Sequence, residues 1–183
     1  IMRIVVTGVP GVGKSTIMDG VAKNIDYKIV NFGDIMLEKA REIGVKNRDE
    51  IRKLTVDKQR ELQRLAGEYI GKMDNVIVDT HMSIKTPAGF LPGLPEWVLK
   101  ALKPSMLVLI EADPKSIMSR RNKDSSRYRD NEKEYDIETH QNMNRYFASA
   151  CATLTGATVV IIKNEEGKIN ETVESLLKMI KNG

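Results

Sequence analysis

Short runs of apolar residues alternate along the chain with longer segments in which apolar residues recur every three or four positions. Continuous apolar runs are typical of buried strands, and the periodic segments are typical of amphipathic helices. This alternation predicts an α/β fold in which helices connect parallel strands and cover both faces of their sheet. Five strands are expected in such a three-layer arrangement, at residues 4–7, 27–31, 76–79, 106–111 and 158–162.

Helices are expected between these strands, with capping and breaking residues at their ends. Asp34 suits the cap of a helix that Gly44 would end, and Pro114 suits the first turn of another. Residues 83–95 contain three prolines and two glycines, and residues 123–133 are polar, so both segments are predicted loops. Helices are expected from about residue 14 and over about residues 34–43, 48–54, 62–73, 95–101, 113–122, 134–154 and 169–180.

The turn between the first predicted strand and helix has the pattern G-x-x-x-x-G-K-[ST], which is typical of a phosphate-binding loop. Its glycines allow backbone conformations in which several N–H groups converge on one anion, and the helix after them adds its positive end. The lysine would reach the β- and γ-phosphates of a nucleotide. A strand before the pattern and a helix after it argue against an ordinary glycine-rich turn. The predicted ATP-binding residues are Gly8, Val9, Pro10, Gly11, Val12, Gly13, Lys14, Ser15 and Thr16.

A carboxylate ends the third predicted strand, next to where the phosphate loop should lie. Asp79 there and the hydroxyl of Ser15 are predicted ligands of a Mg²⁺ ion bound with ATP, because oxygen atoms are the ligands that Mg²⁺ prefers. Asp79 could instead only cap a turn. Glu111 and Asp113 lie at the end of the fourth strand and are rivals for the metal role.

Composition limits the partners and the compartment of this protein. The net charge is +4, and most Lys and Arg residues are interspersed with Asp and Glu, so no nucleic-acid partner is expected. The apolar runs are too short to span a bilayer, and no membrane partner is expected. The single cysteine, Cys151, is consistent with a reducing cytoplasm.

Two classes of phosphate-loop protein compete, a nucleotide switch and a small-molecule kinase. A guanine-reading switch would carry N-K-x-D, but Asn122-Lys123 is followed by Asp124-Ser125, and no glycine stands three residues after Asp79. A kinase needs mobile arginines that close over the phosphates. Residues 120–133 are a predicted short lid, although a solvated basic loop or a nucleic-acid contact would have the same composition. The basic cluster in this segment consists of Arg120, Arg121, Lys123, Arg127 and Arg129.

Several motifs resemble those of archaeal adenylate kinases, in the same order along the chain. The resemblance extends from Met2 to about Gly167, and its proline-rich segment at residues 86–95 is more specific than the phosphate loop. It implies a P-loop kinase fold and the transfer of a phosphoryl group from ATP·Mg²⁺ to AMP, giving two ADP. The motifs are residues 8–16, 31–34, 49–54, 78–81, 86–95, 120–130 and 155–158.

The resemblance also implies roles for individual residues within a single domain, residues 1–183. Lys14, Arg120 and Arg127 would stabilise the moving phosphoryl group, with Arg121 and Arg129 as alternates in the lid and Arg120 also contacting ATP. Residues 163–167 would lie against the donor adenine. Residues 31–64 would bind AMP, with Gly33 and Asp34 near its nucleoside. Thr80 and His81 follow Asp79 where bacterial relatives carry Gly-Phe-Pro-Arg, so Arg52 is the expected partner of the AMP phosphate.

Assembly and acceptor stay open on sequence alone. The family resemblance implies a homo-oligomer, a homotrimer. Another acceptor such as CMP, UMP or a metabolite is the main alternative to AMP. A module that binds RNA or protein according to its nucleotide state is a further one.

Overall fold

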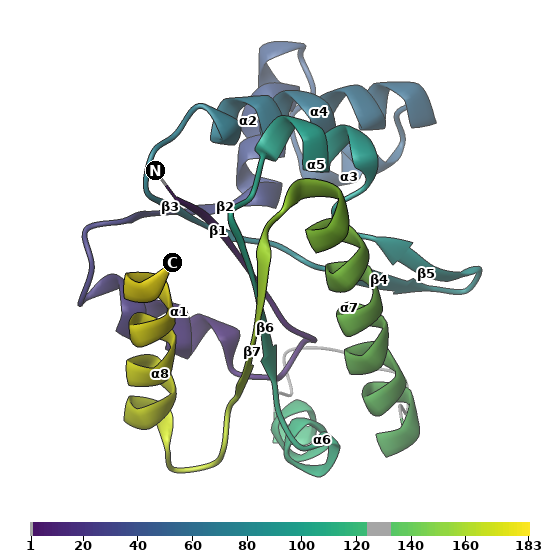
Figure 1. Ribbon diagram of the computed structural model, residues 1–183. Coiled ribbons are helices and arrows are strands. Elements are labelled where there is room, and N and C mark those ends of the chain that lie inside the picture. Colours follow the sequence, from purple (N-terminus) through teal and green to yellow (C-terminus); the bar gives the residue numbers. More distant parts are fainter. Residues whose placement is uncertain (1, 124–132) are drawn as a thin grey trace.

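The computed structural model describes residues 2–123 and 133–183, and its centre is a five-stranded parallel sheet (Figure 1). The strand order is β2-β3-β1-β6-β7, so the chain begins in the middle of the sheet, builds one side and then the other. The five strands and three layers confirm the α/β prediction. The strands are β1 (Arg3–Thr7), β2 (Lys28–Asn31), β3 (Val76–Asp79), β6 (Met106–Glu111) and β7 (Thr158–Lys163).

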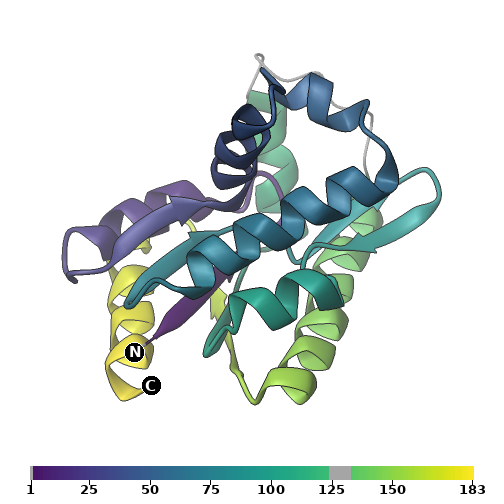
Figure 2. The same ribbon diagram turned by 90° about the horizontal axis from the view of Figure 1, so that it is seen from above.

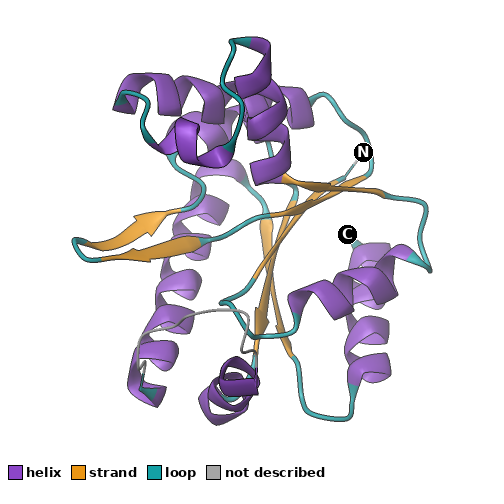
Figure 3. Cartoon of the chain, turned by 180° about the vertical axis from the view of Figure 1, so that it is seen from behind, coloured by secondary structure: helices purple, strands orange, loops and turns teal. Residues whose placement is uncertain are grey.

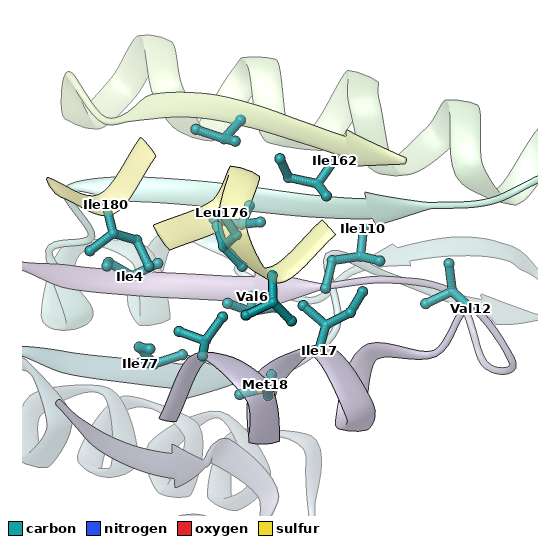
Figure 4. Close-up of a cluster of buried hydrophobic side chains, with 14 of the residues drawn as sticks. Ile4, Val6, Val12, Ile17, Met18, Ile77, Ile110, Ile162, Leu176 and Ile180 are labelled. Carbon is teal, nitrogen blue, oxygen red and sulfur yellow. The ribbon is translucent and has the colours of Figure 1, made fainter. Parts of the chain in front are cut away.

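Two apolar cores lie on opposite faces of the sheet, because side chains alternate along each strand. On β1, Ile4 and Val6 belong to one core, whereas Val5 belongs to the other. Figure 4 shows the first core, where Ile17 and Met18 of α1 and Leu176 and Ile180 of α8 meet the strands. Each strand of this five-stranded sheet has its carboxyl end at the same edge, where Asn31, Asp79 and Glu111 end their strands.

Helices cover both faces, as the views from above and from behind show (Figures 2 and 3). Helices α1 and α8 pack together on one face, and α4, α5 and α7 cover the other. None of the helices in residues 2–123 and 133–183 has both the length and the apolar character required to cross a membrane. The helices are α1 (Lys14–Ala22), α2 (Phe32–Glu42), α3 (Arg48–Arg52), α4 (Val56–Gly71), α5 (Glu96–Leu102), α6 (Pro114–Lys123), α7 (Glu134–Thr155) and α8 (Ile169–Asn182).

The segment predicted as a loop at residues 83–95 is largely a β-hairpin, so that prediction was wrong. Strands β4 (Ser83–Thr86) and β5 (Gly89–Pro92) pair antiparallel and project from the body of the molecule (Figure 3). Gly89 has a φ of 113°, which suits a tight turn. Pro87 lies in the turn and Pro92 at the end of a strand, where proline removes no essential ladder bond. The hairpin is held to α7, because His140 Nε2 lies 3.2 Å from the carbonyl of Ser83.

The cap of α2 also differs from the prediction. Asn31 is the N-cap, and its Oδ1 accepts a hydrogen bond from the backbone N–H of Asp34 at 3.0 Å. Asp34 therefore lies in the first turn, where its negative charge suits the positive end of the helix dipole. One residue, Asn31, both ends β2 and starts α2, with no loop between them.

Candidate functional site

The predicted phosphate loop, residues 8–13, connects the carboxyl end of β1 to the start of α1. Gly11 and Gly13 have φ values of 88° and 92°, and the N–H of Val12 donates to the carbonyl of Val9 at 3.2 Å. The side chains of Val9 and Val12 are buried and fix the inner side of the loop, and Figure 4 shows Val12 at the end of the core. The apolar anchors and the left-handed glycines together hold the loop as a compact turn ahead of the positive end of α1.

Asn164, the residue after β7, holds the phosphate loop by a side-chain hydrogen bond. Its Nδ2 donates to the carbonyl of Val12 at 2.9 Å, and its backbone N–H donates to the carbonyl of Glu111 at 2.7 Å. A Cβ on Gly13 would lie 2.5 Å from this Nδ2 atom, so Gly13 is required for space as well as for its backbone conformation. Residues 163–167 were predicted to lie against the donor adenine, and this contact of Asn164 was not predicted. A polar residue directly after a buried strand was the available signal.

Lys14 and Asp79, predicted from different motifs, meet at the mouth of the loop. The Nζ of Lys14 lies 2.6 Å from Oδ1 of Asp79 and also donates to the carbonyl of Thr80 at 3.1 Å. The two side chains are 15% and 26% exposed, so the pair is partly shielded from water. Asp79 thus balances the charge of Lys14, and a triphosphate would compete for the same ammonium group.

The rival carboxylates have other partners. Arg145 donates to both carboxylate oxygens of Glu111, at 2.7 and 2.6 Å, across the end of β6. Asp113 accepts a bond from the backbone N–H of Lys115 at 2.9 Å, at the start of α6. Of the three carboxylates considered, the structure therefore brings Asp79 to the phosphate-loop lysine and commits the other two to structural contacts.

The oxygen atoms near Lys14 fit a Mg²⁺ ion that arrives with a nucleotide. Ser15 and Thr16 lie exposed in the first turn of α1, and Asp79 supplies a carboxylate. Within residues 2–123 and 133–183, no group of three His, Cys, Asp or Glu side chains is arranged to hold a metal. A hydroxyl and one carboxylate leave most positions to phosphate oxygens and water, as is usual for Mg²⁺ in phosphoryl-transfer sites.

The basic end of α6 lies against the carbonyl side of the phosphate loop. Arg120 Nη1 donates to the carbonyls of Gly11 and Val12, at 3.3 and 2.8 Å, and its Nη2 lies 2.9 Å from Oε1 of Glu166. Arg121 Nε donates to the carbonyl of Pro10 at 2.8 Å. The structure therefore places Arg120 beside the loop, and action on a moving phosphoryl group would require it to leave these carbonyls.

Arg127 and Arg129, the other predicted lid arginines, lie outside the described residues. The same holds for most of the predicted lid, residues 120–133, of which the structure describes only the two ends. Their predicted roles stay predictions.

The predicted acceptor residues lie on the elements that follow β2. Gly33 and Asp34 form the first turn of α2, and Arg48 Nη2 lies 2.5 Å from Oδ1 of Asp34. Arg52 ends α3, where it pairs with Asp49 at 3.2 Å and is 77% exposed. Arg48, a second arginine in this region, was not predicted as a site residue, although it lies beside Gly33 and Asp34.

His81 lies two residues after Asp79 and is exposed at the surface. Its pKa is lowered, chiefly because neighbouring protein shields part of the ring from water, and further by the positive charge of Lys14; the negative charge of Asp79 opposes this in part. The ring is accordingly neutral near pH 7. A neutral ring adds no further positive charge to the phosphate site.

Comparisons with known proteins agree with this geometry. A family model described as an AAA domain matches residues 7–138. Curated adenylate kinases from Thermoplasma volcanium and Methanopyrus kandleri are 55% and 54% identical to the chain, over 98% and 97% of its length and 100% and 97% of theirs.

Solved shikimate kinases have a similar fold. One from Acinetobacter baumannii has a TM-score of 0.64 at 13% identity, covering 100% of this chain and 94% of its own. One from Bacteroides thetaiotaomicron has a TM-score of 0.61 at 16% identity, covering 98% of both chains. At such low identity these two structures support the kinase fold alone.

Proposed function

Because this chain belongs to the family of archaeal adenylate kinases, with an AAA domain over residues 7–138, we infer that it moves the terminal phosphoryl group of ATP to AMP and forms two ADP. The observation in the structure that carries this inference is the meeting of Lys14 and Asp79, 2.6 Å apart at the mouth of the phosphate loop. A phosphotransferase needs a mobile positive charge there, and an oxygen ligand for the metal that accompanies ATP.

We propose that ATP binding separates this pair. The β- and γ-phosphates replace Asp79 as partners of Lys14, and backbone N–H groups of residues 11–16 bind the same phosphates. Ser15 and Asp79 would hold Mg²⁺, which supplies positive charge to the phosphate oxygens. Lys14 then stabilises the charge that spreads over the phosphoryl group in the transition state, while Arg120 and Arg127 contribute from the lid.

The identity of the acceptor nucleotide can be tested with a panel of nucleotides. Formation of ADP from ATP and Mg²⁺ should be fast with AMP, and at least about a hundredfold slower with GMP, CMP, UMP or no acceptor. Comparable rates with CMP or UMP would assign a different acceptor to the same fold. ATP hydrolysis that no acceptor accelerates would indicate an ATPase or a nucleotide switch.

Arg52 is the proposed partner of the AMP phosphate. Replacing Arg52 with alanine should raise the KM for AMP by about tenfold or more, because a charge-assisted bond to phosphate is lost, and should leave the KM for ATP nearly unchanged. Steady-state kinetics with each substrate varied in turn measure both constants.

Two other arginines make this test specific. Arg41→Ala is the control. It removes an exposed arginine from the last turn of α2, at the other end of that helix from Gly33 and Asp34, and should change neither KM. Arg48→Ala removes the arginine that pairs with Asp34. A selective rise in the KM for AMP in Arg48→Ala, without one in Arg52→Ala, would transfer the phosphate role to Arg48.

The proposed partners of this enzyme are ATP, AMP and ADP. We propose that the chain is a single domain in which residues 31–64 form the acceptor region and residues 120–133 form the lid.

We also propose a homotrimer, from the family resemblance, and a cytoplasmic location. Sedimentation equilibrium should give three times the chain mass of 20.6 kDa. A single-chain mass would contradict the trimer and leave the activity untouched.

A further inference from the structure

Asn31 makes two side-chain hydrogen bonds that connect two parts of the site. The register of the sheet places Asn31 of β2 directly beside Asp79 of β3. Its Oδ1 accepts from the backbone N–H of Asp34 at 3.0 Å, and its Nδ2 donates to Oδ2 of Asp79 at 3.3 Å. Asp79 in turn contacts Lys14 through its other oxygen, Oδ1. A single amide thus lies between the first turn of α2 and the carboxylate that faces the phosphate loop.

The orientation of this amide follows from its two neighbours. A backbone N–H requires an acceptor and a carboxylate requires a donor, so the oxygen must face Asp34 and the nitrogen must face Asp79. Serine or threonine would cap the helix equally well but is too short to hold a neighbouring strand's carboxylate as well. Aspartate would cap it but could not donate. Capping alone therefore does not explain the amide at this position.

We propose that Asn31 is a positioning residue that orients Asp79 and links it to the acceptor helix α2. With Oδ2 of Asp79 held by Asn31, Oδ1 is directed at Lys14 and, when nucleotide takes Lys14, at the metal. Any movement of α2 on the acceptor side moves Asn31 with it, because Asn31 is both the last residue of β2 and the cap of α2. The inference rests on the proposed function, in which Asp79 holds Mg²⁺ and α2 belongs to the acceptor region.

Two substitutions at Asn31 separate its role as the cap of α2 from its bond to Asp79. Asn31→Ser keeps an oxygen for the N–H of Asp34 and loses the bond to Asp79, whereas Asn31→Ala loses both. In thermal unfolding, Asn31→Ser should match the wild type, and Asn31→Ala should unfold about 3 °C lower because its helix is uncapped. The rate of ADP formation by both variants should fall by about tenfold or more, which is the usual effect of removing a partner that orients a metal ligand.

A binding measurement tests the link without relying on turnover. Calorimetry should show that the gain in ATP affinity caused by Mg²⁺ is about tenfold smaller in Asn31→Ser than in the wild type. Asn47 is a matched control, because it caps α3 in the same way by accepting from the N–H of Glu50 at 2.9 Å. Asn47→Ser should leave the Mg²⁺-dependent gain within about twofold of the wild type.

A double-mutant cycle shows whether Asn31 acts through Asp79. In an Asp79→Asn background, Asn31→Ser should cause no further loss of the Mg²⁺-dependent gain in affinity, because the group that it orients is already gone. Additive losses would overturn the inference, and so would an Asn31→Ser enzyme with wild-type activity and Mg²⁺ response. A wild-type protein without any phosphoryl transfer to AMP would instead overturn the proposed function, so the two failures are distinguishable.

Discussion

Replacing Lys14 with alanine should lower kcat by about a thousandfold or more, while the thermal unfolding midpoint stays within a few degrees of the wild type. The transition state of phosphoryl transfer spreads negative charge over the transferred group, and Lys14 is the loop cation placed to balance it. The fold should tolerate the loss, because Lys14 is not part of either apolar core and Asp79 keeps its bond to Asn31. Rapid-quench measurement of ADP formation at saturating ATP and AMP gives kcat.

Lys23 provides the matched control for this experiment. It lies exposed at the C-terminal end of the same helix, α1, and Lys23→Ala removes the same charge far from the phosphate loop. This variant should retain wild-type kcat. A Lys14→Ala enzyme with kcat within about tenfold of the wild type would show that the lid, and not the loop lysine, carries most of the charge stabilisation.

Replacing Asp79 with asparagine should lower kcat by about a hundredfold and raise the Mg²⁺ concentration needed for half-maximal activity. Asparagine has the shape of aspartate and keeps one acceptor oxygen, so the main change is the loss of negative charge. The same change removes the ion-pair partner of Lys14, 2.6 Å away in this structure. Titrating Mg²⁺ at fixed ATP and AMP measures the effect.

Asp113 tests whether the metal role belongs to Asp79 specifically. It lies just after β6, which β1 separates from β3, and accepts a bond from the backbone N–H of Lys115. Asp113→Asn should leave the Mg²⁺ requirement unchanged. A large increase in the Mg²⁺ requirement of Asp113→Asn, with little change in Asp79→Asn, would reassign the metal ligand.

The layered sheet and the phosphate loop were predictable because both depend on local patterns. Continuous apolar runs identify strands that are buried on two faces, and the spacing from Gly8 to Ser15 is required for backbone N–H groups to surround an anion. Topology then brings distant residues together: the carboxyl ends of neighbouring strands share one edge, which is why Asp79 was expected near Lys14 and was found there.

The details that were wrong or missed depend on contacts between elements. Residues 83–95 have a loop-like composition, yet they form a hairpin whose first strand is bonded to His140 of α7. Asn31, and not Asp34, is the cap of α2, because β2 leads directly into α2 without a loop. Asn164 reaches the phosphate loop only through the register of β6 and β7. The contacts of the hairpin and of Asn164 join residues far apart in the sequence, and a polar residue after a buried strand was the only local signal for Asn164.

Incubating the protein with ADP and Mg²⁺ alone tests the central claim most directly, because it asks whether two nucleotide sites on this fold exchange a phosphoryl group. Phosphorus NMR should show ATP and AMP appearing in equal amounts until equilibrium, and Lys14→Ala should show neither on the same timescale. Persistence of ADP, or its hydrolysis to AMP and phosphate without ATP, would contradict the assignment of a donor and an acceptor site to this chain.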